Sequence, residues 1–298
     1  MIDIGICAGL KSDNYIPILI NSLKKKAKYP DNLNIIICKN ETINISDDFL
    51  KKFCNKLVKV NYKDDNCSLT HSFMLHKLFE NFNNEYGMFI DTDVIMMLDN
   101  WDVTLVNLLT NNIVRCGVPF GKKYRYDAYH INKPMSIFYL FKTKIFKKIN
   151  IKFTPLIYEM IINEDKFNEY QNIFNFELIK NLKDDIIDFD DYIKKKRLSK
   201  EYPPGMSCVY TTTNLDLLGI ESNEDYVLFD SSSQVPVYLH KHKYKSIVFD
   251  NVNDNMKPYK IYGDKYYFND KILLIHLGGG SYRSNLAIRK WENYSKKL

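Results

Sequence analysis

The stretch Glu85-Tyr-Gly-Met-Phe-Ile-Asp-Thr-Asp-Val-Ile-Met-Met97 decides the fold. An apolar run from Met88 to Ile90 ends in two carboxylates, Asp91 and Asp93, and apolar residues resume directly after them. A continuous apolar run of this kind is typical of a strand buried on both faces, as in a parallel sheet. The two acids would then stand at the carboxyl edge of the sheet, which is where open α/β sheets bind ligands.

Two carboxylates one residue apart repel each other unless a cation or a hydrogen-bond network lies between them. The simplest interpretation of Asp91 and Asp93 is therefore a divalent metal site that holds a phosphate-bearing substrate. A pair of acids that caps a helix or a turn is the alternative. The spacing alone does not separate the two, because the D-x-D pattern is short.

The residues around this stretch predict alternating strands and helices. We expect strands over 2–8, 33–38 and 57–62, with 85–97 as the fourth, and helices over 13–28, 46–54 and 68–82. This alternation is typical of a parallel, doubly wound sheet with helices on both faces. Further along, the pattern predicts helices over 100–109, 143–149, 161–178 and 285–297, a loop over 121–134, and strands over 113–118, 135–141, 227–229, 235–239, 245–249, 259–268 and 271–277.

Composition indicates one globular α/β protein. The chain has 298 residues, 45% of them hydrophobic and 26% charged, and its net charge is +6. Lysines are spread along the chain, which favours solvated faces over a nucleic-acid surface. None of the six cysteines forms a C-x-x-C pair, and no run reaches the length of a membrane span. We therefore expect reduced thiols, a cytoplasmic location, no nucleic-acid partner and no membrane span.

A second motif, Ile275-His-Leu-Gly-Gly-Gly-Ser-Tyr-Arg283, follows a predicted apolar strand. Consecutive glycines let backbone N–H groups approach phosphate oxygens closely, and Arg283 could bind them bidentately. A histidine at a strand end is a suitable ligand for Mn²⁺ beside carboxylates. The alternative is a glycine-rich turn after a core strand.

These motifs resemble those of the nucleotide-diphospho-sugar glycosyltransferases of the GT-A fold. The resemblance rests on Asn66, a helix beginning near Thr70-His71-Ser72, the Asp91-Thr-Asp93 strand end, Asn100-Trp-Asp102 and the strand over 133–141, together with the His276 segment. It implies a Rossmann-like, mixed and mostly parallel sheet in a single domain, with a nucleotide-sugar-binding half over 1–150. The acceptor-side half, 151–298, would be irregular and would return to the active site at its C-terminal segment.

The resemblance also implies roles for individual residues. Asp93 would bind Mn²⁺ or Mg²⁺ directly, Asp91 would contact the metal or the ribose, and His276 would be the third protein ligand. Residues expected around the nucleotide and diphosphate are Ala8, Gly9, Leu10, Lys39, Asn66, His71, Thr92, Gly278, Gly279, Gly280, Ser281 and Arg283. For His71, packing on the helix surface is an equal alternative.

The expected activity is transfer of a sugar from a nucleoside-diphosphate donor, with UDP as the first choice, to a hydroxyl of a glycan or glycoconjugate. An inverting reaction needs a carboxylate base, and the acid-rich stretch 184–191 supplies Asp188 and Asp190 as candidates; without a base, a retaining reaction is favoured. Two alternatives stay open. One is a haloacid-dehalogenase-type phosphatase with Asp91 as nucleophile, and the other is a non-catalytic nucleotide- or glycan-binding module.

The pair His240 and His242 lies in the predicted strand region 235–242. Because no cysteine or third acid lies near it in sequence, we expect surface histidines there, not a zinc site.

Overall fold

A computed structural model describes most of the first 153 residues and several later segments. The described residues are 1–62, 67–119, 134–153, 209–211, 226–228, 231–251, 264–278 and 285–296.

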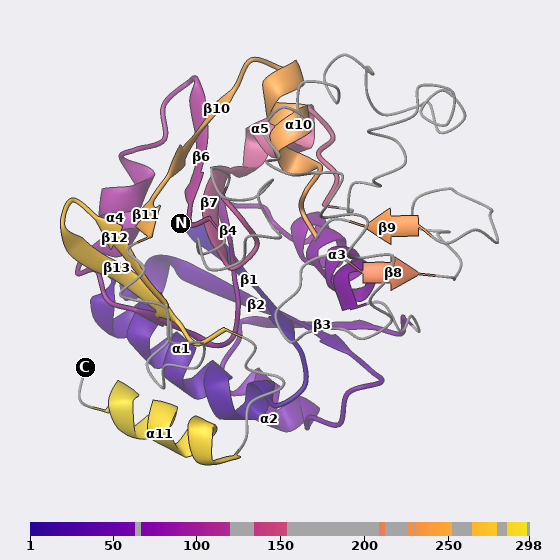
Figure 1. Ribbon diagram of the computed structural model, residues 1–298, viewed down its shortest axis with the longest axis vertical. Helices are drawn as coiled ribbons and strands as arrows, with labels where there is room; N and C mark the ends of the chain where they lie inside the picture. The colour runs from indigo at the N-terminus through magenta and orange to yellow at the C-terminus, as the bar shows by residue number, and fades with distance from the viewer. Residues whose placement is uncertain are drawn as a thin grey trace.

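A seven-stranded sheet forms the centre of the protein, in the order β10-β6-β7-β4-β1-β2-β3 (Figure 1). Its strands are β1 (Ile2–Ala8), β2 (Leu33–Asn40), β3 (Lys56–Val60), β4 (Tyr86–Ile90), β6 (Ile113–Gly117), β7 (Phe138–Lys142) and β10 (Lys245–Val248). Neighbouring strands are parallel except that β7 runs antiparallel to both β4 and β6. This mixed, mostly parallel sheet confirms the predicted fold class.

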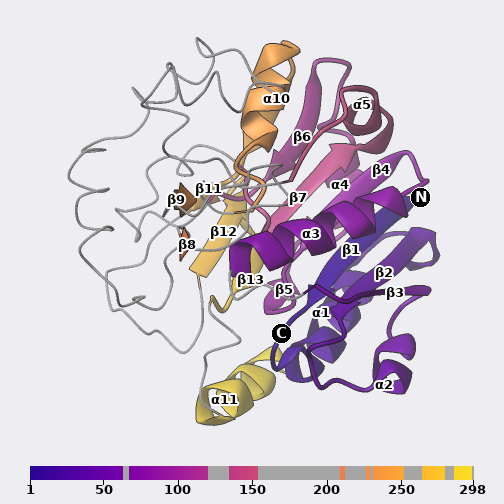
Figure 2. The same cartoon turned by 90° about the vertical axis from the view of Figure 1, so that its right-hand side faces the viewer.

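Helices cover both faces of the sheet (Figure 2). Apolar side chains of α1 (Ser12–Lys26), α2 (Asp47–Lys51) and α4 (Trp101–Val106) pack on one face. Those of α3 (Cys67–Glu80), α5 (Thr143–Lys148) and α10 (Val235–Lys241) pack on the other. A 3-10 turn, η1 (Pro30–Asn32), lies between α1 and β2.

A smaller antiparallel sheet contains the strand that follows the D-T-D turn and the strand that ends in His276. Its order is β11-β12-β13-β5, with β5 (Val94–Met96), β11 (Asp250–Asn251), β12 (Asp264–Phe268) and β13 (Lys271–His276). The helix α11 (Asn285–Ser295) follows, and Ile288 and Trp291 on it pack with Tyr15 of α1 and Ile95 of β5. A separate pair joins β8 (Val209–Thr211) to β9 (Tyr226–Leu228).

Two expectations about elements are wrong. The stretch 85–97 is not one strand, because the chain turns at Asp91–Asp93 and its second part, β5, joins the smaller sheet. Residues 235–239 are not a strand but the start of α10. Val235, Tyr238 and Leu239 have helical spacing and are buried together, and a proline at the first turn suits a helix start.

Other features agree with the sequence-based expectations. The helix α2 lies within the predicted range 46–54, and the Ser46 hydroxyl caps it by accepting a hydrogen bond from the Phe49 N–H. Cys7, Cys38, Cys54 and Cys116 carry free thiols. His240 and His242 are exposed, although they lie on and after a helix. None of the helices in the described part of the chain combines the length and apolar character needed to cross a bilayer. The predicted loop 121–134 and helix 161–178 lie outside the described residues, apart from Pro134.

Candidate metal centre at the carboxyl edge of the sheet

The topology creates a natural ligand site between β1 and β4. From β1 the chain proceeds to β2 and β3 on one side, whereas β4 pairs with β1 on its other side. The carboxyl ends of β1 and β4 therefore lie together where the strand order reverses. Ligands of open α/β sheets bind in the crevice at such a point. The D-T-D turn follows β4 directly at this edge.

Backbone hydrogen bonds hold both ends of the D-T-D turn. The Asp91 N–H donates to the carbonyl oxygen of Ile137 (2.9 Å), just before β7, and the Leu277 N–H donates to the carbonyl oxygen of Asp93 (3.0 Å). The turn is thus tied to the central sheet on one side and to the end of β13 on the other. The two hydrogen bonds therefore fix the short turn that separates the apolar strands β4 and β5.

Pairing of β13 with β5 brings His276 to the acids. The antiparallel register aligns Leu274 with Met96, Ile275 with Ile95 and His276 with Val94. His276 thereby arrives next to the residue that follows Asp93, although the two segments are distant in sequence. The ladder fixes this position through main-chain hydrogen bonds, independently of any ligand.

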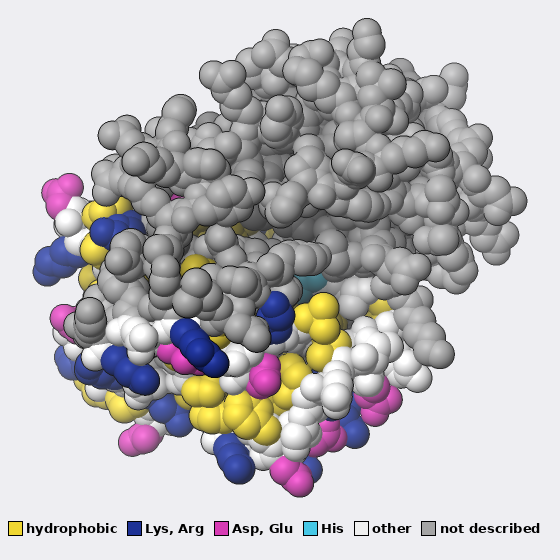
Figure 3. All heavy atoms as spheres, turned by 60° about the horizontal axis from the view of Figure 1, so that its bottom comes forward, with side chains coloured by type: hydrophobic (Ala, Val, Ile, Leu, Met, Phe, Trp, Pro, Cys, Tyr) yellow, Lys and Arg dark blue, Asp and Glu magenta, His cyan; other side chains and the backbone are white. Residues whose placement is uncertain are grey.

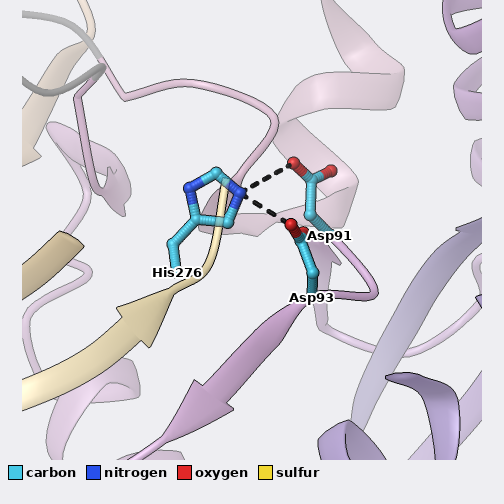
Figure 4. A group of neighbouring side chains, drawn as sticks. All are labelled: Asp91, Asp93 and His276. Atoms are coloured by element: carbon cyan, nitrogen blue, oxygen red, sulfur yellow. Dashed lines mark ion pairs between the residues drawn. The ribbon is translucent and has the colours of Figure 1, made fainter. Parts of the chain in front are cut away.

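The three side chains converge on one small volume (Figure 4). His276 Nε2 lies 3.3 Å from Asp93 Oδ1 and 3.8 Å from Asp91 Oδ2, and one ligand atom of each residue lies within 4.8 Å of the others. The Asp93 and His276 side chains are 9% and 11% exposed, whereas Asp91 is 31% exposed. Asp91 therefore forms the open side of the group.

Electrostatics favour a positive charge at the centre of this group. Burial by itself would lower the pKa of His276, but the charge of Asp93, its hydrogen bond, and the charges of Asp91 and Asp264 outweigh burial. Together they raise the pKa of His276 to about 9. The imidazolium thus balances the acids at neutral pH when no other cation is bound.

The donor set fits a divalent metal ion. Octahedral Mg²⁺ has bonds of about 2.1 Å, so its neighbouring ligand atoms lie about 3 Å apart and opposite ones about 4.2 Å apart. The separations of 3.3 and 3.8 Å lie within that range. Two carboxylates and an imidazole suit Mn²⁺ as well. A metal would replace the proton of His276, since the ligating imidazole must be neutral.

The loop after β1 reaches the same place. The Gly9 N–H donates to Ser12 Oγ (2.8 Å), and the Ser12 hydroxyl donates to Thr92 Oγ1 (3.4 Å). Ala8 is buried, whereas Leu10 is 60% exposed. The structure therefore brings Gly9 and Thr92 together through Ser12, which is not among the site residues expected from the sequence.

Lys39 does not approach the acids. Its Nζ donates to the carbonyl oxygen of Ile45 and to Asp47 Oδ1 (2.9 Å). Hydrogen bonds from Lys39 and Lys59 lower the pKa of Asp47 to about 2. The described contacts thus direct Lys39 toward α2, and contact with a nucleotide remains a prediction.

His71 belongs to a polar chain beside the turn. Its Nδ1 is hydrogen-bonded with Ser231 Oγ (2.9 Å), and Ser231 Oγ lies 3.4 Å from Ser136 Oγ, next to Ile137. Burial lowers the pKa of His71 to about 4, so the imidazole is neutral at pH 7. Sequence reasoning missed Ser136 and Ser231, because isolated serines give no signal before the fold brings them together.

The remaining expected site residues can be placed only in part. Gly278 has a φ of +70°, a left-handed conformation that favours glycine, so the chain turns sharply two residues after His276. The others lie outside the described residues: Asn66, Asp188, Asp190, Gly279, Gly280, Ser281 and Arg283.

Comparisons with known proteins give matches only at the level of structure. No family model and no curated protein matches the sequence. About half of the chain is similar to parts of several solved glycosyltransferases. For the mannosyltransferase PcManGT from Pyrobaculum calidifontis, solved with GDP-Man and Mn²⁺, the TM-score is 0.38 at 10% identity over 50% of this chain and 46% of that chain.

Two further similar structures have comparable values. S. aureus TarS 1-349 in complex with UDP-GlcNAc has a TM-score of 0.36 at 11% identity, over 51% of this chain and 48% of that chain. The bifunctional WbbM apo structure has a TM-score of 0.36 at 14% identity, over 50% of this chain and 32% of that chain. The alignments thus span less than half of the length of each of these proteins.

Proposed function

We propose that the protein is a metal-dependent glycosyltransferase that moves a sugar from a nucleoside-diphosphate donor to a hydroxyl of a glycan or related acceptor. The observation that carries the proposal is the convergence of Asp91, Asp93 and His276 at the carboxyl edge, beside the β1–β4 switch point. A divalent cation held there would face the crevice in which open α/β sheets bind ligands. Such a cation is the natural partner of a diphosphate.

The exposure of the three side chains suggests different roles in metal and donor binding. Asp93 and His276 are nearly buried and would hold Mn²⁺ or Mg²⁺ from the protein side, whereas the more exposed Asp91 would face the donor. When bound, the ion would neutralise charge that develops on the departing nucleoside diphosphate. The backbone bonds at Asp91 and Asp93 keep the carboxylates in place before the donor arrives, which is what preorganised charge stabilisation requires.

The loop after β1 would position the nucleotide. Ser12 fixes Gly9 next to Thr92, and glycine permits close approach of a ligand to the backbone. The segment Gly278 to Arg283 would cover the diphosphate from the other side. We assign the acceptor to the half of the chain beyond residue 150, with Asp188 and Asp190 as candidate bases. UDP remains the first choice of nucleotide.

A phosphatase with Asp91 as nucleophile would use the same acids differently. Its carboxylate would form a phosphoaspartate, which aluminium fluoride mimics. Trapping such an adduct on Asp91 would support the phosphatase and contradict the proposed glycosyltransferase activity. A non-catalytic module would instead bind nucleotide sugars without turnover.

The test is donor turnover with and without metal. The full chain would be incubated with a panel of UDP- and GDP-sugars, with Mn²⁺ or EDTA, and the nucleoside diphosphate released by transfer or hydrolysis would be measured. We expect release from one donor class with Mn²⁺ alone and its loss in Asp93→Asn, whose side chain has nearly the same shape. The exposed Asp48→Asn serves as the matched control and should retain activity. Equal release in EDTA would refute the metal role.

A further inference from the structure

A cavity away from the metal centre lies between α1, β5 and the end of α11. Its volume is about 330 Å³, near the lower end of the roughly 300–1,000 Å³ typical of small-molecule sites. Its floor is apolar and its rim is basic. Pro17, Ile18, Ile95 and Met97 contribute to the floor, and Lys25 and Lys296 contribute to the rim.

The cavity results from the way α11 packs. Ile288 and Trp291 of α11 are buried with Tyr15 and Ile95, whereas the helix end at Ser295 and Lys296 borders the opening. Ile18 and Met97 are partly buried against the same cluster. A partly exposed apolar floor between two helices is therefore built into the fold.

Positive charge is concentrated on the two helices that flank the cavity and on the residues that directly follow them. Residues 12–28 contain four lysines and one aspartate, and residues 285–296 contain three cationic side chains and one glutamate. These two segments together have a net charge of +5, whereas the net charge of the whole chain is +6. Lys26 pairs with Asp99 (2.8 Å), but Lys24, Lys25 and Lys296 are exposed.

Stabilisation of α1 explains why lysines lie in its last turn, but it does not explain why they lie beside an apolar cavity. Lysines in the last turn of α1 interact favourably with the helix dipole. That effect requires neither an apolar cavity nor a cation contributed by a second helix. Tyr29, which is 50% exposed, lies just beyond α1 with the Lys28 ammonium 5.3 Å from its ring centre. An exposed aromatic residue among cations is typical of surfaces that bind at a membrane interface.

We propose that this cavity binds an anionic lipid at a membrane surface. The apolar part of the lipid would lie on the floor formed by Ile18 and Met97, and its negative headgroup would lie between Lys25 and Lys296. Figure 3 looks onto this end of the molecule, where hydrophobic side chains lie next to lysine and arginine side chains. The site is separate from the metal centre, so it does not depend on the proposed transferase activity.

Sedimentation with lipid vesicles tests the proposal. The full chain would be mixed with vesicles of phosphatidylcholine alone or with about one third phosphatidylglycerol. We expect binding to the anionic vesicles only, and weaker binding in 0.5 M NaCl, because salt screens exposed charges. Each lysine near an anionic surface contributes about fivefold to binding. The double variant Lys25→Glu with Lys296→Glu should therefore bind at least about 25-fold more weakly.

A matched variant and a soluble competitor make the result specific. Lys56→Glu with Lys144→Glu makes the same charge change at exposed positions elsewhere and should retain most of the binding. Ile18→Asn should weaken binding without a change of net charge. Equal loss in both double variants, equal binding to neutral vesicles, or full displacement by millimolar glycerol 3-phosphate would each overturn the lipid site.

Discussion

At the scale of single residues, Asp93 is central to the candidate site. Its side chain is the least exposed of the three that converge there. Its carboxylate lies 3.3 Å from His276 Nε2, and its backbone carbonyl accepts the hydrogen bond from Leu277. The same residue thus offers a carboxylate oxygen to the candidate metal site and binds, through its backbone, the residue that follows His276. Removal of the carboxylate should affect metal binding far more than the fold, because the backbone bond remains.

A buried histidine gives a pH-dependent prediction at this scale. His76 Nε2 accepts a hydrogen bond from the Phe153 N–H (3.1 Å). Burial, together with the charges of Lys152 and Lys77, lowers the pKa of His76 to about 4. The unfolded chain, with a pKa of about 6.5, therefore binds a proton first as the pH falls. The free energy of unfolding should decrease from about pH 6.5 to about pH 4, by the order of 1–3 kcal/mol for this residue.

Urea unfolding at several pH values measures this effect. His76→Gln keeps an acceptor for the Phe153 N–H and does not titrate, so its stability should fall less steeply over this pH range. The exposed His240→Gln should behave like the wild type. An identical pH dependence in His76→Gln and the wild type would contradict the assignment.

The convergence of Asp91, Asp93 and His276 could be predicted, but contacts of single polar side chains could not be. The D-x-D pair follows the apolar strand β4, His276 ends the apolar strand β13, and the resemblance to GT-A glycosyltransferases suggested that they share one site. Lys39 also follows apolar residues at a strand end, yet the structure pairs it with Asp47. Ser136 and Ser231 carry no sequence signal, since their partners come from distant segments.

At the scale of elements, the break between β4 and β5 positions the site. If the run 85–97 continued as one strand, both acids would remain within a single sheet. The turn instead passes the chain from the central sheet to the smaller one, where β13 pairs with β5. The boundary between the two sheets is therefore also the place where Asp91, Asp93 and His276 converge.

The contact between β6 and β7 yields a prediction for this part of the sheet. A Cβ at Gly117 would meet the carbonyl oxygen of Phe138 and lie 2.6 Å from Tyr139 Cβ. Because a backbone atom cannot move aside without shifting β7, Gly117→Ala should reduce the free energy of unfolding by at least about 1–3 kcal/mol. Urea denaturation would measure the loss, with the exposed Lys245→Ala on neighbouring β10 as control. A Gly117→Ala protein as stable as the wild type would disprove this close packing.

The local pattern of apolar residues predicted most of the described helices and strands. It did not predict which of the two larger sheets each strand joins. The apolar run at 235–239 was short enough to suit a strand or a buried helix, and packing of Tyr238 and Leu239 against α3 and α5 selected the helix. Likewise, nothing local shows that β5 leaves the central sheet. That choice depends on β13, which lies far along the chain.

At the scale of the whole molecule, the candidate site is completed by the return of the C-terminal segment. β13 supplies His276, and α11 packs on α1 and β5. The alternation of the first hundred residues was sufficient to predict the parallel strands β1 to β4 and the position of the D-T-D turn after them. The division into donor and acceptor halves near residue 150 remains a prediction, because much of the second half lies outside the described residues.

Calorimetric titration of Mn²⁺ into the metal-free full chain is the most direct test of the central claim. The account predicts one site in the wild type, with release of about one proton at pH 7.5 as His276 becomes a neutral ligand, measured in buffers of different ionisation enthalpy. In Asp93→Asn the affinity should fall by more than the roughly 10–100-fold typical of outer-shell substitutions, while Asp48→Asn binds normally. Wild-type protein that binds no Mn²⁺, or Asp93→Asn that binds it equally well, would contradict the account.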